Sequence, residues 1–276
     1  MRSISLIALP YDSARFNERM GRGPTALLDA GLAKELQGKG FKVEVVPVRL
    51  ADGFYHEGRA LVELQRLTVP LIRDAISKGS RPVLLSGNCS TAALSAVSAF
   101  RSREVAVVWF DAHGDFNTPE TSASGFLDGM ALAILTGRCW STLAENFEDF
   151  QVMPEKHIIQ IGVRNTDPKE EANLDRSTIT RIGPTDLGKL QDGLNQLPVR
   201  QLYVHVDVDV LDPSEGDANS FACPGGITLE NLIGALELIG QTATIVAGSV
   251  TAYDPIADRD GRIGRAIPRI VELLAK

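Results

Sequence analysis

The stretch Val105–Asp115, VAVVWFDAHGD, and the stretch Gln201–Asp209, QLYVHVDVD, share one pattern. In each, an apolar run with the length of a buried strand leads directly into acidic side chains. In sheets of parallel strands, ligands bind beyond the carboxyl ends of the strands. The two stretches therefore predict buried parallel strands with a functional site at one edge of the sheet.

The alternation of apolar runs and helical patterns extends along the whole chain. Further apolar runs lie at Ser3–Leu9, Lys42–Val48, Pro82–Leu85, Ile158–Ile161 and Thr244–Val250. Helical patterns lie at Pro24–Gln37, Glu57–Ser77, Thr91–Phe100, Gly129–Thr136, Asp186–Leu197, Leu229–Leu238 and Ile263–Leu274. Strands that are apolar on both faces and separated by helices are typical of a sheet covered on both sides. We predict an α/β fold, a single-domain three-layer α/β/α sandwich with a mainly parallel sheet over residues 1–276.

Composition and charge exclude several classes of protein. Of the 276 residues, 44% are hydrophobic and 23% are charged, which is typical of a packed globular chain. A net charge of −7 opposes a cationic groove, so nucleic acid is not an expected partner. No apolar run reaches the roughly 20 residues that span a bilayer, so a membrane is not expected either. The amino terminus does not read as a signal peptide, and three scattered cysteines fit a reducing compartment, which predicts a cytoplasmic protein.

The acidic stretches predict a metal site. Alternate residues of an extended chain lie on one side, so Asp111, His113 and Asp115 are expected to converge, as are Asp207 and Asp209. For either stretch alone, solvated turn carboxylates are the simpler interpretation. Four carboxylates at the ends of buried strands, however, repel one another unless cations balance them. Oxygen ligands with one imidazole suit manganese or a similar divalent ion, and shared aspartates permit two metal ions with a bridging hydroxide for hydrolysis.

A third polar cluster, Ser86-Gly87-Asn88-Cys89-Ser90, follows the run Pro82–Leu85. Taken alone, it is typical of a glycine turn in which Ser90 is the N-cap of a helix that begins at Thr91 and Cys89 is a buried small residue. Its position after a strand also puts it where polar clusters mark a site.

With these clusters in this order, the sequence resembles the ureohydrolase family, which includes arginases, agmatinases and formiminoglutamases. The resemblance covers nearly the whole chain. Its motifs are the GxGPxAL-like segment Gly21–Leu27, the GGDHS-like segment Ser86–Ser90, the DAHxD block Asp111–Asp115 and the SxDxDxxDP block His205–Pro213, with Gly225-Gly226 downstream. The resemblance implies the arginase-like fold, a homo-oligomer, a binuclear manganese centre and hydrolysis of a linear amidine or guanidine.

The resemblance also implies roles for individual residues. One metal ion would be held by Cys89, Asp111, Asp115 and Asp207, and the other by His113, Asp111, Asp207 and Asp209, so that Asp111 and Asp207 bridge. The segment Asn117–Gly125 resembles the arginase segment whose Asn and Ser hold the substrate α-carboxylate, which implies Asn117 and Ser124. The segment Gly162–Pro168 resembles the one whose second Asp binds the α-amino group, which implies Asp167. Taken singly, each of these three residues is also typical of turn chemistry.

Four positions depart from the arginase pattern. Cys89 stands where the usual motif has a His ligand, and a thiolate is softer and adds negative charge. Asp128 stands where arginases place a His before Gly-Met, so the proton shuttle is either Asp128, another group or absent. We predict Asp115 and Asp128 as the catalytic residues. Phe126 replaces a polar contact to the carboxylate, and Ala252 replaces the carboxylate that clamps the guanidinium. The Cys89 change is similar to a branch of the family that hydrolyses Nω-hydroxyarginine in cycloserine biosynthesis.

We therefore predict an arginase-family amidinohydrolase with two divalent metal ions, manganese being the expected metal. Its substrate would be a guanidino or amidino amino acid of the arginine or Nω-hydroxyarginine type. Two alternatives stay open. One is a formiminoglutamate-type iminohydrolase, which would tolerate the loss of the guanidinium clamp at Ala252. The other is a catalytically silent homologue that binds metal.

Overall fold

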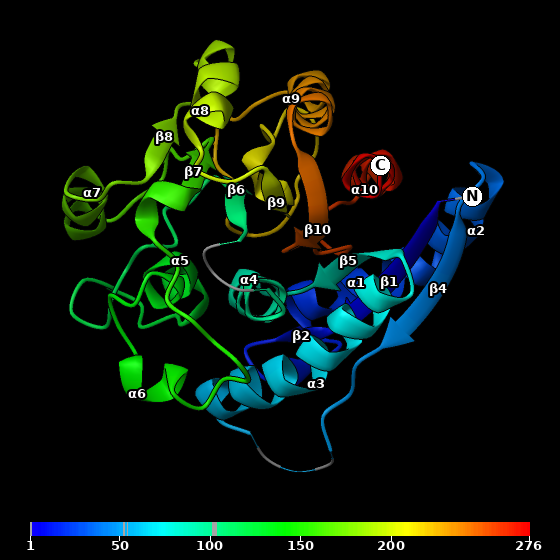
Figure 1. The fold of residues 1–276 in the computed structure, drawn as a ribbon, viewed down its shortest axis with the longest axis horizontal. Helices are drawn as coiled ribbons and strands as arrows, with labels where there is room; N and C mark the ends of the chain where they lie inside the picture. Colours follow the sequence, from blue (N-terminus) through cyan, green and yellow to red (C-terminus); the bar gives the residue numbers. More distant parts are fainter. Residues whose placement is uncertain (1, 52, 54, 101–103) are drawn as a thin grey trace.

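An eight-stranded sheet runs through the middle of the molecule (Figure 1). The computed structural model describes residues 2–51, 53, 55–100 and 104–276. The strands follow the order β4-β1-β5-β10-β9-β6-β7-β8, and each neighbouring pair is parallel. Their bounds are β1 Ser3–Leu9, β4 Lys42–Pro47, β5 Ser80–Ser86, β6 Ala106–Phe110, β7 Ile158–Ile161, β8 Thr180–Ile182, β9 Gln201–Asp207 and β10 Thr244–Thr251. The prediction of a mainly parallel sheet is confirmed.

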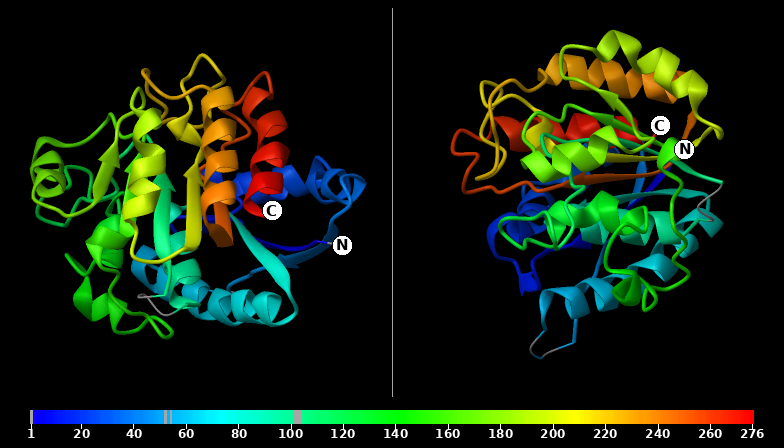
Figure 2. Two further views of the ribbon diagram at one scale, coloured as in Figure 1. Left: turned by 45° about the horizontal axis from the view of Figure 1, so that its top comes forward. Right: turned by 90° about the vertical axis from the view of Figure 1, so that its left-hand side faces the viewer.

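Helices cover both faces of this sheet, and Figure 2 shows the resulting layers from the side. Apolar side chains of α1, α2, α8, α9 and α10 pack on one face, and those of α3, α4 and α5 pack on the other. The helices are α1 Arg22–Asp29, α2 Leu32–Gly38, α3 Glu57–Ser77, α4 Cys89–Ser98, α5 Ala131–Leu135, α6 Ser141–Ala144, α7 Pro168–Asp175, α8 Leu190–Gln196, α9 Leu229–Thr242 and α10 Arg262–Leu274. The three-layer α/β/α sandwich is thus confirmed.

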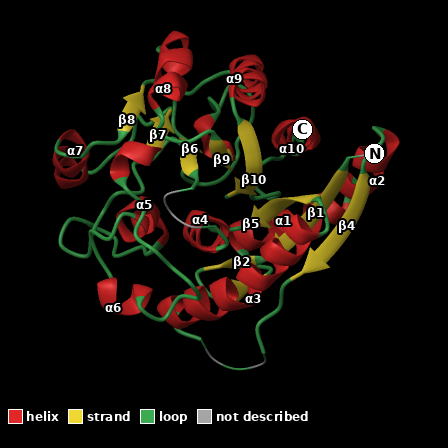
Figure 3. Cartoon of the chain, viewed as in Figure 1, coloured by secondary structure: helices red, strands yellow, loops and turns green. Residues whose placement is uncertain are grey.

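Local conformation breaks one predicted helix and adds short elements. The prediction of a single helix over Pro24–Gln37 is wrong, because the chain turns at Gly31 between α1 and α2. Gly31 has a φ of 94°, in the left-handed region that glycine adopts without steric cost. The sequence pattern does not predict the antiparallel pair β2 Tyr11–Asp12 and β3 Arg15–Phe16, or the three-residue strand β8 (Figure 3). Such segments are too short to show a hydrophobic period.

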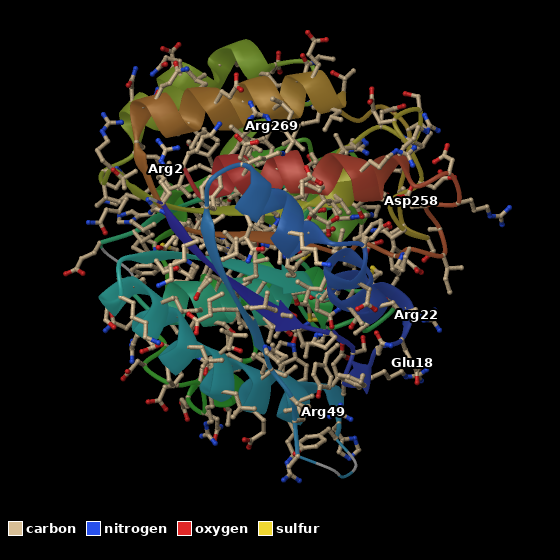
Figure 4. The ribbon with its side chains drawn as sticks, turned by 90° about the vertical axis from the view of Figure 1, so that its right-hand side faces the viewer. Arg2, Glu18, Arg22, Arg49, Asp258 and Arg269 are labelled. Carbon is tan, nitrogen blue, oxygen red and sulfur yellow. The ribbon has the colours of Figure 1, made fainter. Side chains whose placement is uncertain are left out.

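Charged side chains mark the outer surface of the sandwich. The edge strand β4 exposes Lys42, Glu44 and Pro47, residue types that discourage pairing with a further strand. On the helical layer, Arg269 of α10 forms ion pairs with Glu237 of α9 at 2.6 Å and with Glu272 at 2.7 Å (Figure 4). Within the described part of the chain, no helix is both long enough and apolar enough to cross a membrane.

Close backbone packing fixes the turn between β5 and α4. A Cβ atom on Gly87 would overlap the carbonyl oxygen of Tyr11 and lie 2.6 Å from the backbone nitrogen of Gly21. Neither atom can move away by a rotamer change, so only glycine fits at this position. This contact sets the path of the chain into Cys89.

The substitution Gly87→Ala should lower the free energy of unfolding by about 3 kcal/mol through this overlap. The matched control Gly234→Ala lies in α9, where a new Cβ meets no atom within 4 Å. It should leave stability unchanged or raise it by up to about 1 kcal/mol. Urea unfolding followed by circular dichroism measures both, and equal effects of the two substitutions would contradict the packing argument.

Candidate metal centre

Four neighbouring strands of the sheet have their carboxyl ends at one pocket. The strands are adjacent in the order β5-β10-β9-β6. Cys89 follows β5, Asp111 follows β6, Asp207 ends β9 and Ala252 follows β10. All four line a pocket of about 220 Å³. Parallel strands place these side chains together because their carboxyl ends lie at the same edge of the sheet.

Most of the predicted site residues line this pocket. The residues that do so are Cys89, Asp111, His113, Asp115, Asn117, Asp128, Asp167, Asp207 and Asp209. Ser124 is not among the lining residues. It is exposed, and its hydroxyl accepts a hydrogen bond from the Phe126 backbone at 3.2 Å. The structure thus brings the predicted acidic cluster together and leaves Ser124 outside it.

His113 lies between two of the carboxylates. Its Nδ1 is 3.3 Å from Asp111 Oδ1 and 3.4 Å from Asp209 Oδ2. Burial acts to lower the pKa of His113, but its hydrogen bonds to Asp111 and Asp209 outweigh this and raise it to about 12. In the protein alone, a protonated imidazole therefore supplies a cation between the two acids. A metal ion at this position would take over that role.

Burial also perturbs the carboxylates themselves. It raises the pKa of Asp111 to about 6, although its hydrogen bonds with His113 act in the opposite direction. Burial and the neighbouring charge of Asp209 raise the pKa of Asp207 well above its usual range. Desolvation also raises the pKa of Asp115, and the charge of Asp111 is the next largest cause. These carboxyl groups hold protons more tightly because burial removes the water that would stabilise their charged forms, and neighbouring carboxylates repel one another.

Asp115 carries the clearest sign of a missing partner. Its Oδ2 is buried without a hydrogen-bond partner among the described residues. Its backbone has a φ of 49°, a conformation that non-glycine residues adopt rarely and at a cost in strain. The expectation that an extended strand runs through Asp115 is wrong, because β6 ends at Phe110; Asp115 nevertheless lines the pocket. A buried, unpaired carboxylate oxygen fits a cation ligand.

Cys89 faces the same cluster. Its Sγ donates a hydrogen bond to Asp207 Oδ2 at 3.0 Å, and burial with the nearby acids raises the pKa of the thiol well above its usual value. Sulfur, carboxylates and one imidazole form a donor set suited to a divalent transition metal. Two groups of residues each have ligand atoms within 4.8 Å of one another. The first group is Cys89, Asp111 and His205, and the second is Asp111, His113 and Asp209. Each of these groups has a donor set that fits a divalent metal ion.

Asp128 lies at the N-terminus of α4. Its Oδ1 accepts hydrogen bonds from the Ser90 backbone at 2.8 Å and the Ser90 hydroxyl at 2.6 Å. Its Oδ2 accepts from Asn88 Nδ2 at 2.9 Å and from the Cys89 backbone at 3.1 Å. The prediction that Ser90 caps a helix beginning at Thr91 is wrong: α4 begins at Cys89 because the distant Asp128 carboxylate binds its first backbone N–H groups.

The pocket lining also includes the predicted head-group residues Asn117 and Asp167. Asn117 Nδ2 donates to Asp167 Oδ2 at 3.1 Å, which places the two side chains together as the sequence predicts. Glu170, which the sequence analysis does not single out, orients this part of the lining by accepting from the backbone N–H groups of Phe116 at 2.8 Å and Asp167 at 3.2 Å. The pattern Asp167-Pro168-x-Glu170 at a helix start is the signal that marks such a capping arrangement.

An apolar wall completes the pocket. Met20, Phe126, Phe221 and Ala252 line it, and the rings of Phe126 and Phe221 stack with centroids 5.9 Å apart. Phe221 and Asn219 come from the loop after β9, where the sequence shows no catalytic pattern. Asn219 donates to Asp209 Oδ2 at 3.2 Å and to the Ala252 carbonyl at 2.9 Å, and so connects the acidic cluster to the apolar wall.

Replacing Asp128 with Asn should destabilise the start of α4. An amide nitrogen cannot accept, so two of the four donors that now face Asp128 would lose their acceptor. We expect Asp128→Asn to lower the free energy of unfolding by about 3 kcal/mol. Asp192→Asn, an isosteric control on the exposed side of α8, should change it by less than about 0.5 kcal/mol. Chemical denaturation measures both; an Asp128→Asn protein as stable as the control would contradict the capping role.

Comparison with known proteins identifies relatives over the whole length of the chain. Residues 2–275 match the model of the Arginase family. An arginase of Bacillus caldovelox is 26% identical over 283 residues, covering 94% of this chain and 93% of that protein. An arginase of Staphylococcus aureus strain MRSA252 is 29% identical over 281 residues, covering 94% of this chain and 92% of that protein.

Solved structures share the fold. An arginase structure from Bacillus subtilis superposes with a TM-score of 0.88 at 24% identity, covering 99% of this chain and 98% of that chain. A formimidoylglutamase structure from the same species gives a TM-score of 0.78 at 18% identity, covering 100% of this chain and 86% of that chain. At such identities the structural likeness establishes the arrangement of the elements.

Proposed function

This chain belongs to the arginase family, and we propose that it is a hydrolase that uses two divalent metal ions to cleave a non-peptide C–N bond of a guanidino or amidino amino acid. The observation that carries the proposal is the buried cluster of Asp111, Asp115, Asp207 and Asp209, in which one oxygen of Asp115 has no partner among the described residues. Such a cluster requires cations, and its open side faces a pocket large enough for a small molecule.

The proposed ligands are the residues already brought together. Cys89, Asp111, Asp115 and Asp207 would hold one ion, and His113, Asp111, Asp207 and Asp209 the other, with manganese as the expected metal. When bound, two divalent ions supply Lewis acidity and an activated water for attack on the central carbon of the substrate. His113 would have to lose its proton and Cys89 its thiol proton to act as ligands.

The remaining residues would bind and orient the substrate. Asp167 and Asn117 lie together on the pocket wall, where a carboxylate suits an α-ammonium group and an amide suits an α-carboxylate. Ser124 would need to approach from its exposed loop to join them. Asp115 is the proposed catalytic residue. Asp128, predicted from the sequence as a catalytic residue and proton shuttle, is proposed instead to hold the start of α4, because each of its carboxylate oxygens accepts two hydrogen bonds.

The apolar wall bears on the choice of substrate. Ala252 offers no carboxylate to a guanidinium, and Phe126 and Phe221 stack beside it in the pocket lining. An N-hydroxyl group withdraws electrons and makes a guanidine less basic, so Nω-hydroxyarginine suits this wall better than arginine does. The same observation keeps a formiminoglutamate-type iminohydrolase as the second candidate, since a formimino group also needs less charge compensation.

Metal binding should release protons, because burial raises the pKa of Asp207, Asp115 and the Cys89 thiol, and all three must deprotonate to bind. Affinity should therefore fall as pH falls, by about tenfold per unit for each proton released. Calorimetric titration with Mn²⁺ in two buffers of different ionisation enthalpy should count more than one proton per chain at pH 7.

Two variants show whether Mn²⁺ binds at the proposed ligands in the calorimetric titration. Asp207→Ala should lose both ions, because its carboxylate is the proposed bridge, whereas the exposed control Asp192→Asn should still bind two. Binding of less than one ion by the unaltered protein would overturn the binuclear centre.

Substrate choice is tested by incubating the manganese-loaded protein with arginine, Nω-hydroxyarginine, agmatine and formiminoglutamate and identifying products by mass. An α-amino acid should be a better substrate than agmatine, its decarboxylated counterpart. Asp167→Ala should raise KM by roughly tenfold or more while changing kcat less. Asp175→Ala, an exposed position on the same helix, should change neither. Better turnover of agmatine would refute the head-group assignment, and no turnover of any compound would favour the silent homologue.

A further inference from the structure

A chain of buried polar side chains lies directly behind Cys89, inside the sheet. At its centre is His205 of β9, which is fully buried. Its Nε2 is 3.2 Å from Thr251 Oγ1, and its Nδ1 is 2.9 Å from Ser249 Oγ and 3.0 Å from the Tyr203 hydroxyl. Thr251 Oγ1 lies 3.2 Å from Cys89 Sγ. The Tyr203 hydroxyl and Ser249 Oγ are 2.7 Å apart, so the hydrogen-bonded row of side chains runs without a break from Tyr203 to Cys89.

The neighbouring strand holds the His205 ring in place. Trp109 of β6 is paired with His205 in register, and the two rings stack with centroids 3.7 Å apart and planes 10° from parallel. Trp109 Nε1 also donates to Asp111 Oδ2 at 3.1 Å. The imidazole therefore has one fixed orientation, and the residue that fixes it also contacts a proposed metal ligand.

The available donors and acceptors decide which group donates in each hydrogen bond of this row of side chains. In a neutral imidazole one ring nitrogen donates and the other accepts. If Nδ1 accepts, Tyr203 donates to Ser249, Ser249 donates to Nδ1, Nε2–H donates to Thr251, and the Thr251 hydroxyl donates to Cys89. Every proton then has an acceptor. If Nδ1 donates instead, three protons (on Nδ1, Tyr203 and Ser249) have only two acceptors, the Tyr203 and Ser249 oxygens. One of the three protons then has no acceptor among the described residues.

The alternative acceptor for Thr251 is weaker. Its hydroxyl also lies 3.4 Å from the Val206 carbonyl, farther than the sulfur at 3.2 Å. Donors to an anionic acceptor form shorter and stronger hydrogen bonds than donors to a neutral one. An anionic Cys89 therefore favours the direction in which all protons point toward the sulfur.

Two departures from the family motifs meet at this point. Cys89 stands where the GGDHS-like motif has His, and His205 stands where the SxDxDxxDP motif has Ser. A ring nitrogen of His205, an oxygen of Asp111 and Cys89 Sγ lie within 4.8 Å of one another. The smaller side chain at position 89 and the larger one at position 205 therefore lie close together, joined through Thr251.

We propose that His205 is a positioning residue that, through Thr251, directs a hydrogen-bond donor at the Cys89 sulfur, and that Cys89 and His205 depend on each other. This inference rests on the proposed function, in which Cys89 is a metal ligand. The donor withdraws charge from the thiolate and offsets the excess of acidic ligands around the metal ions.

Cobalt(II) tests the proposal because a thiolate bound to cobalt gives a charge-transfer absorption in the near ultraviolet. In the protein with Thr251→Val, which removes the donor and keeps the shape, the band should move to longer wavelength and cobalt affinity should fall about tenfold. Thr251→Ser, which keeps the hydroxyl, should restore both. The matched control Thr68→Val removes a buried hydroxyl that donates to Leu64 in α3, and it should change neither.

The dependence between positions 89 and 205 is tested with the same cobalt titration. Cys89→His alone should bind cobalt at least tenfold more weakly than the double variant Cys89→His with His205→Ser. Equal affinities of these two, or a band and affinity in Thr251→Val that match Thr68→Val, would overturn the inference. An unaltered protein that binds no cobalt, or binds it without the thiolate band, would instead refute Cys89 as a metal ligand and with it that part of the proposed function.

Discussion

The structure is organised around incompletely balanced negative charge at the carboxyl ends of the two adjacent strands β9 and β6. Asp111, Asp115, Asp207 and Asp209 are all buried, and the one cationic group in direct contact with two of them among the described residues is His113. Burying a carboxylate without a partner costs several kcal/mol. Apolar packing on both faces of the parallel sheet offsets this free-energy cost, because it stabilises the strands independently of the charge at their ends.

The apolar pattern of the sequence predicts the central strands well, since β1, β7, β9 and β10 have bounds within a residue of the apolar runs. Gly31 shows why the first helix could not be predicted: both sides of the turn keep the helical period, and only the backbone conformation separates them. Segments such as β8 are held by their neighbours and not by a local pattern.

The site residues likewise fall into those that the sequence pattern predicts and those that it does not. Asp111, His113, Asp207 and Asp209 were predictable because they stand at or just after the ends of apolar runs, and the carboxyl ends of parallel strands meet at one edge of the sheet. The expected extended spacing is not what orients them, since β6 ends at Phe110 and Asp209 lies in a 3-10 turn. The environment of Asp128 depends on a contact with α4, 38 to 40 residues earlier, and no local pattern encodes it. Phe221 and Asn219 reach the pocket from a loop whose path is set by packing, so the sequence gives no signal for them. Long-range contacts, which a single sequence does not reveal, account for these residues.

We propose above all that the acidic cluster is a binuclear metal site in which Cys89 is a ligand. Anomalous X-ray diffraction from crystals grown with Mn²⁺ tests it most directly, because the manganese signal locates each ion independently of the protein atoms. We expect two peaks that share Asp111 and Asp207, one of them bonded to the Cys89 sulfur and the other to His113. A single peak, or an empty cluster with His113 still between Asp111 and Asp209, would contradict it.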